Sequence, residues 1–233
     1  MSTTKIISSK KSKLDITPQI KADCHALSTF PTLCYQARHE GVDDMNKELS
    51  AIIRELEQQG REAKYPNSVK EGFHSTSDFF TIDRPAVKQF HALLVKNLQH
   101  YLRQYWSSES SLPLADLGDL KLQLWGWSLI LREGSISAPH MHPHCMVSGV
   151  YYPEIPDDLN TSKNAGCFIL CDPRPRAAVV PLKGQGNTLV IKPETGLLLM
   201  FPSYMEHYVM PFKGTSERLS IAFNVDLPLH AKG

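Results

Sequence analysis

The sequence has no long hydrophobic run and no paired-cysteine motif. Its longest apolar stretch, Leu197–Phe201 in "GLLLMFP", is far shorter than the roughly 18 residues that a membrane-crossing helix needs. The N-terminal "MSTTKIISSKKSKLDITPQIK" also lacks the apolar core of a secretory signal, so we do not expect export. Five cysteines without CxxC spacing are typical of reduced thiols. Together these absences predict a cytoplasmic protein with neither a disulfide framework nor a zinc ribbon.

The chain also lacks an excess of charge of either sign. Its 25 Lys and Arg residues nearly equal its 24 Asp and Glu residues, which gives a net charge of +1 over 233 residues. A global basic field, which would favour nucleic acid or an anionic membrane as a partner, is therefore absent. Nucleic acid is not supported and no membrane partner is expected, so any partner must be inferred from individual sites.

The order of patterns along the chain predicts one domain. Residues 1–25 are polar and are expected to form a flexible tail, and residues 26–233 form the domain. Within it, residues from about 26 to 110 are helical. Apolar residues recur at helical spacing from Asp43 or Asp44, either of which is a possible N-cap, to a stop at Gly60. A second helix starts near Pro85 and includes "PAVKQFHALLVKNLQHYLRQYW".

The second half, residues from about 119 to 226, changes to short β-branched and aromatic runs separated by Pro and Gly turns. Consecutive strands without intervening helices predict a mainly β fold, a jelly roll of the double-stranded β-helix or cupin-like kind, with the two helices packed outside it. We predict strands over Lys121–Arg132, Met146–Pro153, Gly166–Cys171, Thr188–Lys192, Leu197–Phe201, His207–Pro211 and Arg218–Val225.

Histidines cluster in "APHMHPHCMVSGVYY". In a strand, the side chains of His140 and His142 would point to the same side and could bind one metal ion. His207 in "FPSYMEHYVMPF" could be the third ligand, from another strand. Such a triangle leaves open positions that suit catalytic iron. An HxH spacing alone is also common in structural or solvated positions. Alternation equally allows a His142 and His144 pair, although Pro143 would interrupt the strand there.

Arg218 and Ser220 in "ERLSIAFN" share one strand face and could hold a carboxylate opposite the metal. The alternative is a structural salt bridge or an arginine on an edge strand. Cys145 is expected to be a small buried hydrophobe rather than a zinc ligand. Trp125 and Trp127 share a face and are predicted to belong to the core, while His74 is either structural or part of a substrate pocket.

These motifs resemble the 2-oxoglutarate and Fe(II)-dependent oxygenase superfamily, in particular its subgroup with the pattern HxHP, SGxYY, DPR, FPxxxxH and RxSxAFN. The matching segments are "APHMHPHCMVSGVYY", "GCFILCDPRP", "TGLLLMFPSYMEHYVMPF" and "ERLSIAFN", and the resemblance spans about Phe30 to Asp226. It implies Fe(II) held by His140, His142 and His207, with 2-oxoglutarate as cosubstrate and O2 as oxidant. It further implies that Arg218, Ser220 and Tyr152 bind the distal carboxylate of 2-oxoglutarate.

The implied activity is hydroxylation of a substrate coupled to decarboxylation of 2-oxoglutarate to succinate. Most of the superfamily has Asp or Glu where His142 stands, and an all-imidazole site also suits Zn, Cu and Ni. Two alternatives follow: a cupin-like protein that binds metal without turnover, and a three-histidine dioxygenase that does not use 2-oxoglutarate. The sequence identifies neither the primary substrate nor the oligomeric state.

Overall fold

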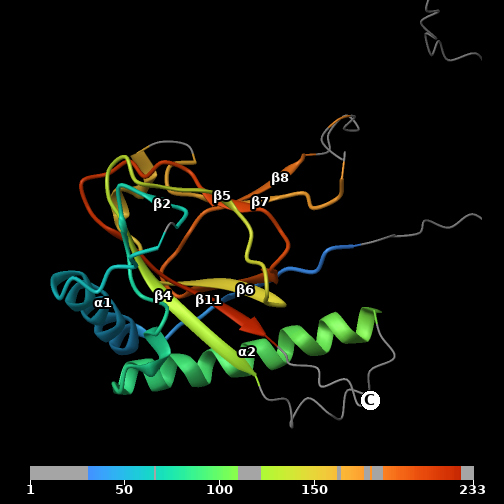
Figure 1. Cartoon of the computed structure of the whole chain (residues 1–233), viewed down its shortest axis with the longest axis horizontal. Coiled ribbons are helices and arrows are strands. Elements are labelled where there is room, and N and C mark those ends of the chain that lie inside the picture. Colours follow the sequence, from blue (N-terminus) through green and yellow to red (C-terminus); the bar gives the residue numbers. More distant parts are fainter. Residues whose placement is uncertain are drawn as a thin grey trace, which may run out of the picture. The chain divides into compact units, whose positions relative to one another are not determined.

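The computed structural model describes residues 31–65, 67–109, 122–161, 164–175, 179 and 186–226. Residues from Thr32 onward form one compact unit, in which two β-sheets face each other and two long helices lie outside them (Figure 1). The predicted tail, residues 1–25, lies outside the described residues.

The larger sheet has six strands in the order β1-β9-β6-β11-β4-β3. Strand β11 is central, because it pairs along its length with β4 on one side and with β6 on the other. Residues at the start of β11 are therefore enclosed by neighbouring strands. The members are β1 (Tyr35–Arg38), β3 (Phe73–His74), β4 (Gln123–Leu131), β6 (Val147–Glu154), β9 (Leu197–Pro202) and β11 (Arg218–Asp226).

The smaller sheet has five strands in the order β2-β5-β10-β7-β8. Every pairing between named strands in both sheets is antiparallel. This arrangement confirms the predicted two-sheet jelly roll. The members of the smaller sheet are β2 (Val69–Lys70), β5 (Ile136–His140), β7 (Phe168–Cys171), β8 (Thr188–Ile191) and β10 (His207–Val209).

All seven predicted strands are present, and the described residues form four further strands that were not predicted. Strands β2 and β3 have two residues each, too few for an alternating pattern to be recognised. Strand β1 is only four residues long, and β5 contains Pro139, a residue that argues against a strand. The unpredicted strands matter for function, because β2, β3 and β5 all contribute side chains to the site.

Both predicted helices are present: α1 (Asp43–Gln58) and α2 (Pro85–Glu109). The prediction that Asp43 or Asp44 is the N-cap is wrong, because the N-cap is Val42 and both aspartates lie in the first turn. There they favour the helix by facing its positive end. Gly60 ends α1 as predicted, with a φ of 65° in the left-handed region that glycine adopts without strain. None of the helices that the structure describes is long and apolar enough to cross a membrane.

Two hydrophobic clusters divide the unit into layers. One cluster joins the helices to the outer face of the six-stranded sheet, where Phe90 of α2 packs on Tyr151 of β6 at 4.7 Å between ring centroids. The other fills the space between the sheets and includes Trp127, Tyr152 and Phe201. Because alternate residues of a strand face opposite ways, β11 buries Leu219 and Ile221 beneath the helices and turns Arg218 and Ser220 toward the space between the sheets.

Candidate metal and anion site

Three histidines meet between the two sheets. His140 ends β5 and lies directly across from His207 of β10 in the strand register. His142 lies two residues beyond β5 in a loop, where its backbone N–H donates to the carbonyl of Ser203. The prediction that His140 and His142 share one strand is therefore wrong. The imidazole of His142 reaches that of His140 because its loop is held in place, and not because the two residues alternate along one strand.

The histidine geometry suits one metal ion. The candidate ligand atoms of His140, His142 and His207 all lie within 4.8 Å of one another. Two nitrogens that bind one ion at about 2.1 Å can be at most about 4.2 Å apart, so small side-chain rotations bring the three to a common centre. Among the described residues this is the one group of three or more His, Cys, Asp or Glu side chains with that proximity.

Backbone carbonyls orient two of these imidazoles. Nδ1 of His140 lies 2.7 Å from the carbonyl oxygen of Ala138, and Nδ1 of His207 lies 2.9 Å from that of Met205. A carbonyl can only accept, so Nδ1 carries the proton in each ring. Nε2 then carries the lone pair that a metal requires, and the hydrogen bond at Nδ1 fixes the ring plane. In His140 this Nε2 lies 3.4 Å from Oγ of Ser68, a long contact that a metal ion would replace.

The site keeps its imidazoles neutral. Burial, followed by the nearby His140, lowers the pKa of His207 to about 3 and that of His142 to about 4. Burial also lowers the pKa of His140 itself. Since a metal binds only the neutral imidazole, protons do not compete for these nitrogens near neutral pH.

The lowered pKa values predict that the metal-free protein loses stability as the pH falls from about 6.5 toward 4. An unfolded histidine binds a proton below about pH 6.5, whereas a histidine in the folded site resists protonation. Each such histidine therefore lowers the free energy of unfolding by up to about 1.4 kcal/mol for every pH unit below about 6.5, down to its folded pKa.

Urea denaturation in the presence of a chelator, at about pH 7 and at pH 5, measures this loss of stability. The His207→Asn variant should lose less stability between the two pH values than the wild type. The His144→Asn variant, changed at an exposed position, should lose as much as the wild type. Equal losses in the wild type and both variants would show that His207 is not one of the histidines responsible.

Arg218 is buried without a negative partner. Its side chain is 1% exposed, its Nε donates to the carbonyl of Gly166 at 3.1 Å and its Nη1 donates to Oγ of Ser220 at 3.4 Å. Its Nη2 is buried without a hydrogen-bond partner, and none of the ion pairs among the described residues includes Arg218. The alternative of an edge-strand arginine is wrong, because β11 lies between β4 and β6, and no described carboxylate forms the alternative salt bridge with Arg218.

Tyr152 stands beside this guanidinium. The charged group of Arg218 lies 4.9 Å from the centroid of the Tyr152 ring. The Tyr152 hydroxyl is buried, no described group accepts a hydrogen bond from it, and the adjacent guanidinium interacts with it. Burial raises the pKa of Tyr152 to about 12, so the hydroxyl stays protonated and can donate. Two buried donors with unused hydrogen-bonding capacity define a place for an anion.

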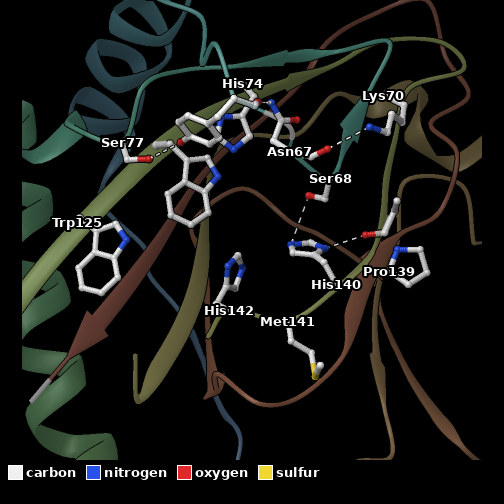
Figure 2. Close-up of a pocket in the computed structure, with 13 residues that line it drawn as sticks. Asn67, Ser68, Lys70, His74, Ser77, Trp125, Pro139, His140, Met141 and His142 are labelled. Atoms are coloured by element: carbon white, nitrogen blue, oxygen red, sulfur yellow. Dashed lines mark hydrogen bonds between the residues drawn. The ribbon is translucent and has the colours of Figure 1, made fainter. Parts of the chain in front are cut away.

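The histidines and Arg218 open on the same narrow cavity, which His140, His142, His207, Arg218 and Ser220 all line. A wider pocket of about 560 Å³ adjoins it and shares His140 and His142 with it. That volume is typical of small-molecule sites. Figure 2 shows these two histidines on the pocket wall, with Trp125 on one side and Lys70 on the other. The arrangement provides a metal position, an anion position behind it and an open space in front.

Sequence reasoning found only part of the wide pocket. Trp125 and Trp127 share a face, as predicted, and pack in the core between the sheets, but they also line this pocket. His74 is a pocket residue as well, stacked on Trp127 at 5.5 Å between ring centroids. Ser68 and Lys70 were not predicted, since neither the two-residue strand β2 that contains Lys70 nor the loop before it that contains Ser68 carries a sequence signal.

The remaining candidates lie away from the three histidines. His144 is exposed in a turn with a φ of 68°. Cys145 is half-buried, and its thiol lies 3.4 Å from the carbonyl oxygen of His142 rather than among the imidazoles. The four cysteines that the structure describes are free, as predicted, and Cys24 lies outside the described residues.

A family comparison supports the motif-based interpretation. Residues 126–224 match the family described as "Putative 2OG-Fe(II) oxygenase", a segment that begins within β4 and ends within β11. A comparison with proteins of curated function gives no match. The family match confirms the resemblance predicted from the motifs, and it includes all three histidines, Arg218 and Ser220.

Solved structures share the fold at low sequence identity. A Pseudomonas putida prolyl-4-hydroxylase is 18% identical with a TM-score of 0.57, covering 83% of this chain and 92% of the other. A Trichoplax adhaerens prolyl hydroxylase, solved with a hypoxia inducible factor peptide fragment, is 15% identical with a TM-score of 0.52, covering 83% of both chains. HygX from Streptomyces hygroscopicus, solved with nickel and 2-oxoglutarate, is 13% identical with a TM-score of 0.51, covering 85% of this chain and 84% of the other.

The two facing sheets form a jelly roll, and the histidine cluster between them could hold one metal ion. Residues 126–224 therefore resemble the Fe(II)- and 2-oxoglutarate-dependent oxygenases in sequence, and the described chain shares its fold with a solved prolyl-4-hydroxylase.

Proposed function

We propose that His140, His142 and His207 hold Fe(II), and that Arg218, Ser220 and Tyr152 hold the distal carboxylate of 2-oxoglutarate. The observation that carries this proposal is the buried, unpaired guanidinium of Arg218, which lines the same cavity as the three imidazoles. A buried cation costs several kcal/mol of folding free energy unless an anion compensates it. A dianionic cosubstrate would supply that compensation.

The proposed reaction hydroxylates a substrate C–H bond while 2-oxoglutarate and O2 become succinate and CO2, with one oxygen atom in each of the alcohol and succinate. When bound, the iron would supply the oxidising chemistry. The chain's own residues would do the rest: the guanidinium and hydroxyls orient the cosubstrate, and the carbonyls of Ala138 and Met205 hold two ligand rings. The wide pocket would then present the C–H bond from the opposite side.

An all-imidazole triad keeps a second candidate open, a three-histidine dioxygenase without a 2-oxo acid. That candidate gives no role to Arg218, whose burial without an anion would then be an uncompensated cost. A metal-binding protein without turnover leaves the same cost unexplained. The anion site therefore favours the 2-oxoglutarate-dependent enzyme.

Anaerobic titration of the Fe(II) protein with 2-oxoglutarate tests the proposal. We expect the weak visible charge-transfer band that forms when a 2-oxo acid chelates Fe(II). Glutarate has the same two carboxylates without the oxo group, so it should compete for Arg218 but produce no band. If iron is demonstrably bound and 2-oxoglutarate gives no band, the three-histidine dioxygenase or the metal-binding protein becomes the better account.

A further inference from the structure

The wide pocket in front of the histidines combines an aromatic wall with one charged side chain. We call Tyr65, His74, Trp125 and Trp127 the aromatic wall, because all four rings line the pocket. The wall is continuous over most of its length: Tyr65 lies 6.1 Å from His74 and His74 lies 5.5 Å from Trp127, between ring centroids. Such surfaces bind flat apolar groups by stacking.

The wall reaches from solvent to the metal position. Tyr65 is 50% exposed and its hydroxyl lies 2.7 Å from Oγ of Ser77 at the pocket. At the other end, Trp127 lies 5.5 Å from His142 between ring centroids. A ring that enters along Tyr65 would therefore be led toward the ligand histidines.

The charge in this pocket has one sign. Lys70 is the single lysine or arginine among the described lining residues, and none of them is Asp or Glu. The Lys70 ammonium donates a hydrogen bond to the carbonyl of Asn67 at 3.1 Å. This bond holds the Lys70 side chain at the side of the pocket, next to Asn67, as Figure 2 shows. No ion pair among the described residues includes it.

Neighbouring acidic groups do not reverse this field. Burial lowers the pKa of His74, backbone hydrogen bonds at Ser75 and at His74 itself oppose this shift, and the exposed Glu62 contributes least. Glu62 does not line the pocket, and Asp78 is paired with Arg61. A dipositive metal at the histidines would make the pocket more positive still.

Resting on the proposed function, we infer that the primary substrate joins a flat apolar ring to an anionic group, with the ring on the aromatic wall and the anion toward Lys70. Polycationic substrates are disfavoured, because no carboxylate of the described lining would receive an ammonium group. The polar groups of Asn67, Ser68 and Ser77 can accept further hydrogen bonds from the substrate at the pocket side.

The test uses three probes of equal length that differ in charge: 4-phenylbutyrate, its neutral amide and 4-phenylbutylamine. Binding to the full chain is measured by ligand-observed NMR, anaerobically, with Fe(II) and saturating 2-oxoglutarate so that the Arg218 site is already filled. We expect the carboxylate to bind about fivefold or more tighter than the amide, and the amine to bind weakest. Equal or tighter binding of the amine would overturn the inference.

Variants locate the two contacts. Lys70→Met should remove the preference for the carboxylate over the amide, whereas Lys64→Met, at an exposed position outside the pocket, should keep it. Trp125→Leu should weaken all three probes alike. Since Trp125 also packs in the core, the exposed Tyr65→Ala provides a second wall variant with less risk to folding. An unchanged preference in Lys70→Met would contradict the anion contact, and unchanged affinities in both wall variants would contradict the ring contact.

The same experiments distinguish failure of the proposed substrate class from failure of the proposed 2-oxoglutarate-dependent activity. The charge-transfer band of Fe(II) with 2-oxoglutarate is recorded first in every protein. If the band is absent from the wild type, the proposed function fails before any probe is added. If the band is present in the wild type and in Lys70→Met but the probes show no charge preference, only the substrate inference fails.

Discussion

Replacement of Arg218 by methionine is expected to abolish 2-oxoglutarate binding and to leave metal binding intact. The guanidinium is 1% exposed and its Nη2 is unpaired, so a carboxylate there would form charge-assisted hydrogen bonds away from water. Loss of one partner of such a pair costs about 3 kcal/mol or more, which corresponds to a weakening of roughly 100-fold or more. The charge-transfer band of the Fe(II) protein, titrated with 2-oxoglutarate, measures the loss.

Stability separates this effect from misfolding. Methionine keeps much of the volume and removes a buried charge, so Arg218→Met should be about as stable as the wild type without ligand. The wild type should gain stability as 2-oxoglutarate is added, because only the folded state binds it, and Arg218→Met should not. Normal 2-oxoglutarate binding in this variant would show that the anion site is misassigned.

Arg132 provides the matched control. It lies at the end of the β4 segment, but its guanidinium pairs with Glu57 at 2.7 Å and with Glu217 at 2.6 Å. Arg132→Met should lower stability by breaking this partly exposed network while retaining the 2-oxoglutarate response. The contrast rests on one physical difference: Arg132 has carboxylate partners within the chain, and Arg218 has none among the described residues.

The sequence predicted the elements with strong periodicity. The two helices and seven strands follow from apolar repeats long enough to recognise, and "RLSIAF" placed Arg218 and Ser220 on one strand face, as the structure has them. The histidine cluster was predicted correctly from an incorrect premise. His142 reaches His140 because its loop is fixed by Ser203, a contact distant in sequence that alternation cannot reveal.

The wide pocket was largely beyond prediction. Its residues come from the short strands β2 and β3, from β5, from the neighbouring loops and from the inner face of β4. A two-residue strand such as β2 has no period, so nothing in the sequence indicated Lys70 or Ser68, the residue just before β2. Trp125 and Trp127 were predicted as core residues because large aromatic residues at alternating positions are usually buried; the structure shows that the same face also borders an opening. The roles of the predicted ligands stay predictions.

Replacement of His207 by alanine is expected to remove bound Fe(II) and, with it, the 2-oxoglutarate band and all turnover. His207 is 4% exposed, faces His140 across the strand pair, and has its Nδ1 fixed by Met205. Changes to residues that only orient a ligand already cost about 10- to 100-fold in metal affinity, so loss of a ligand should cost at least about 100-fold. Competition with a calibrated chelator, in the absence of oxygen, measures the affinity.

Two further variants make that result specific. His207→Gln keeps a polar side chain of similar size, so loss of metal there cannot be attributed to an empty cavity beside Phe168 and Phe201, the rings that lie 5.5 Å and 4.8 Å from that of His207. His144→Ala should retain iron, because His144 is exposed outside the cluster. Retained iron in both His207 variants, or loss of iron in His144→Ala, would overturn the ligand set. In the expected outcome, the cross-strand pair His140 and His207 binds the metal together with His142 of the anchored loop, and Arg218 selects the acid that joins it.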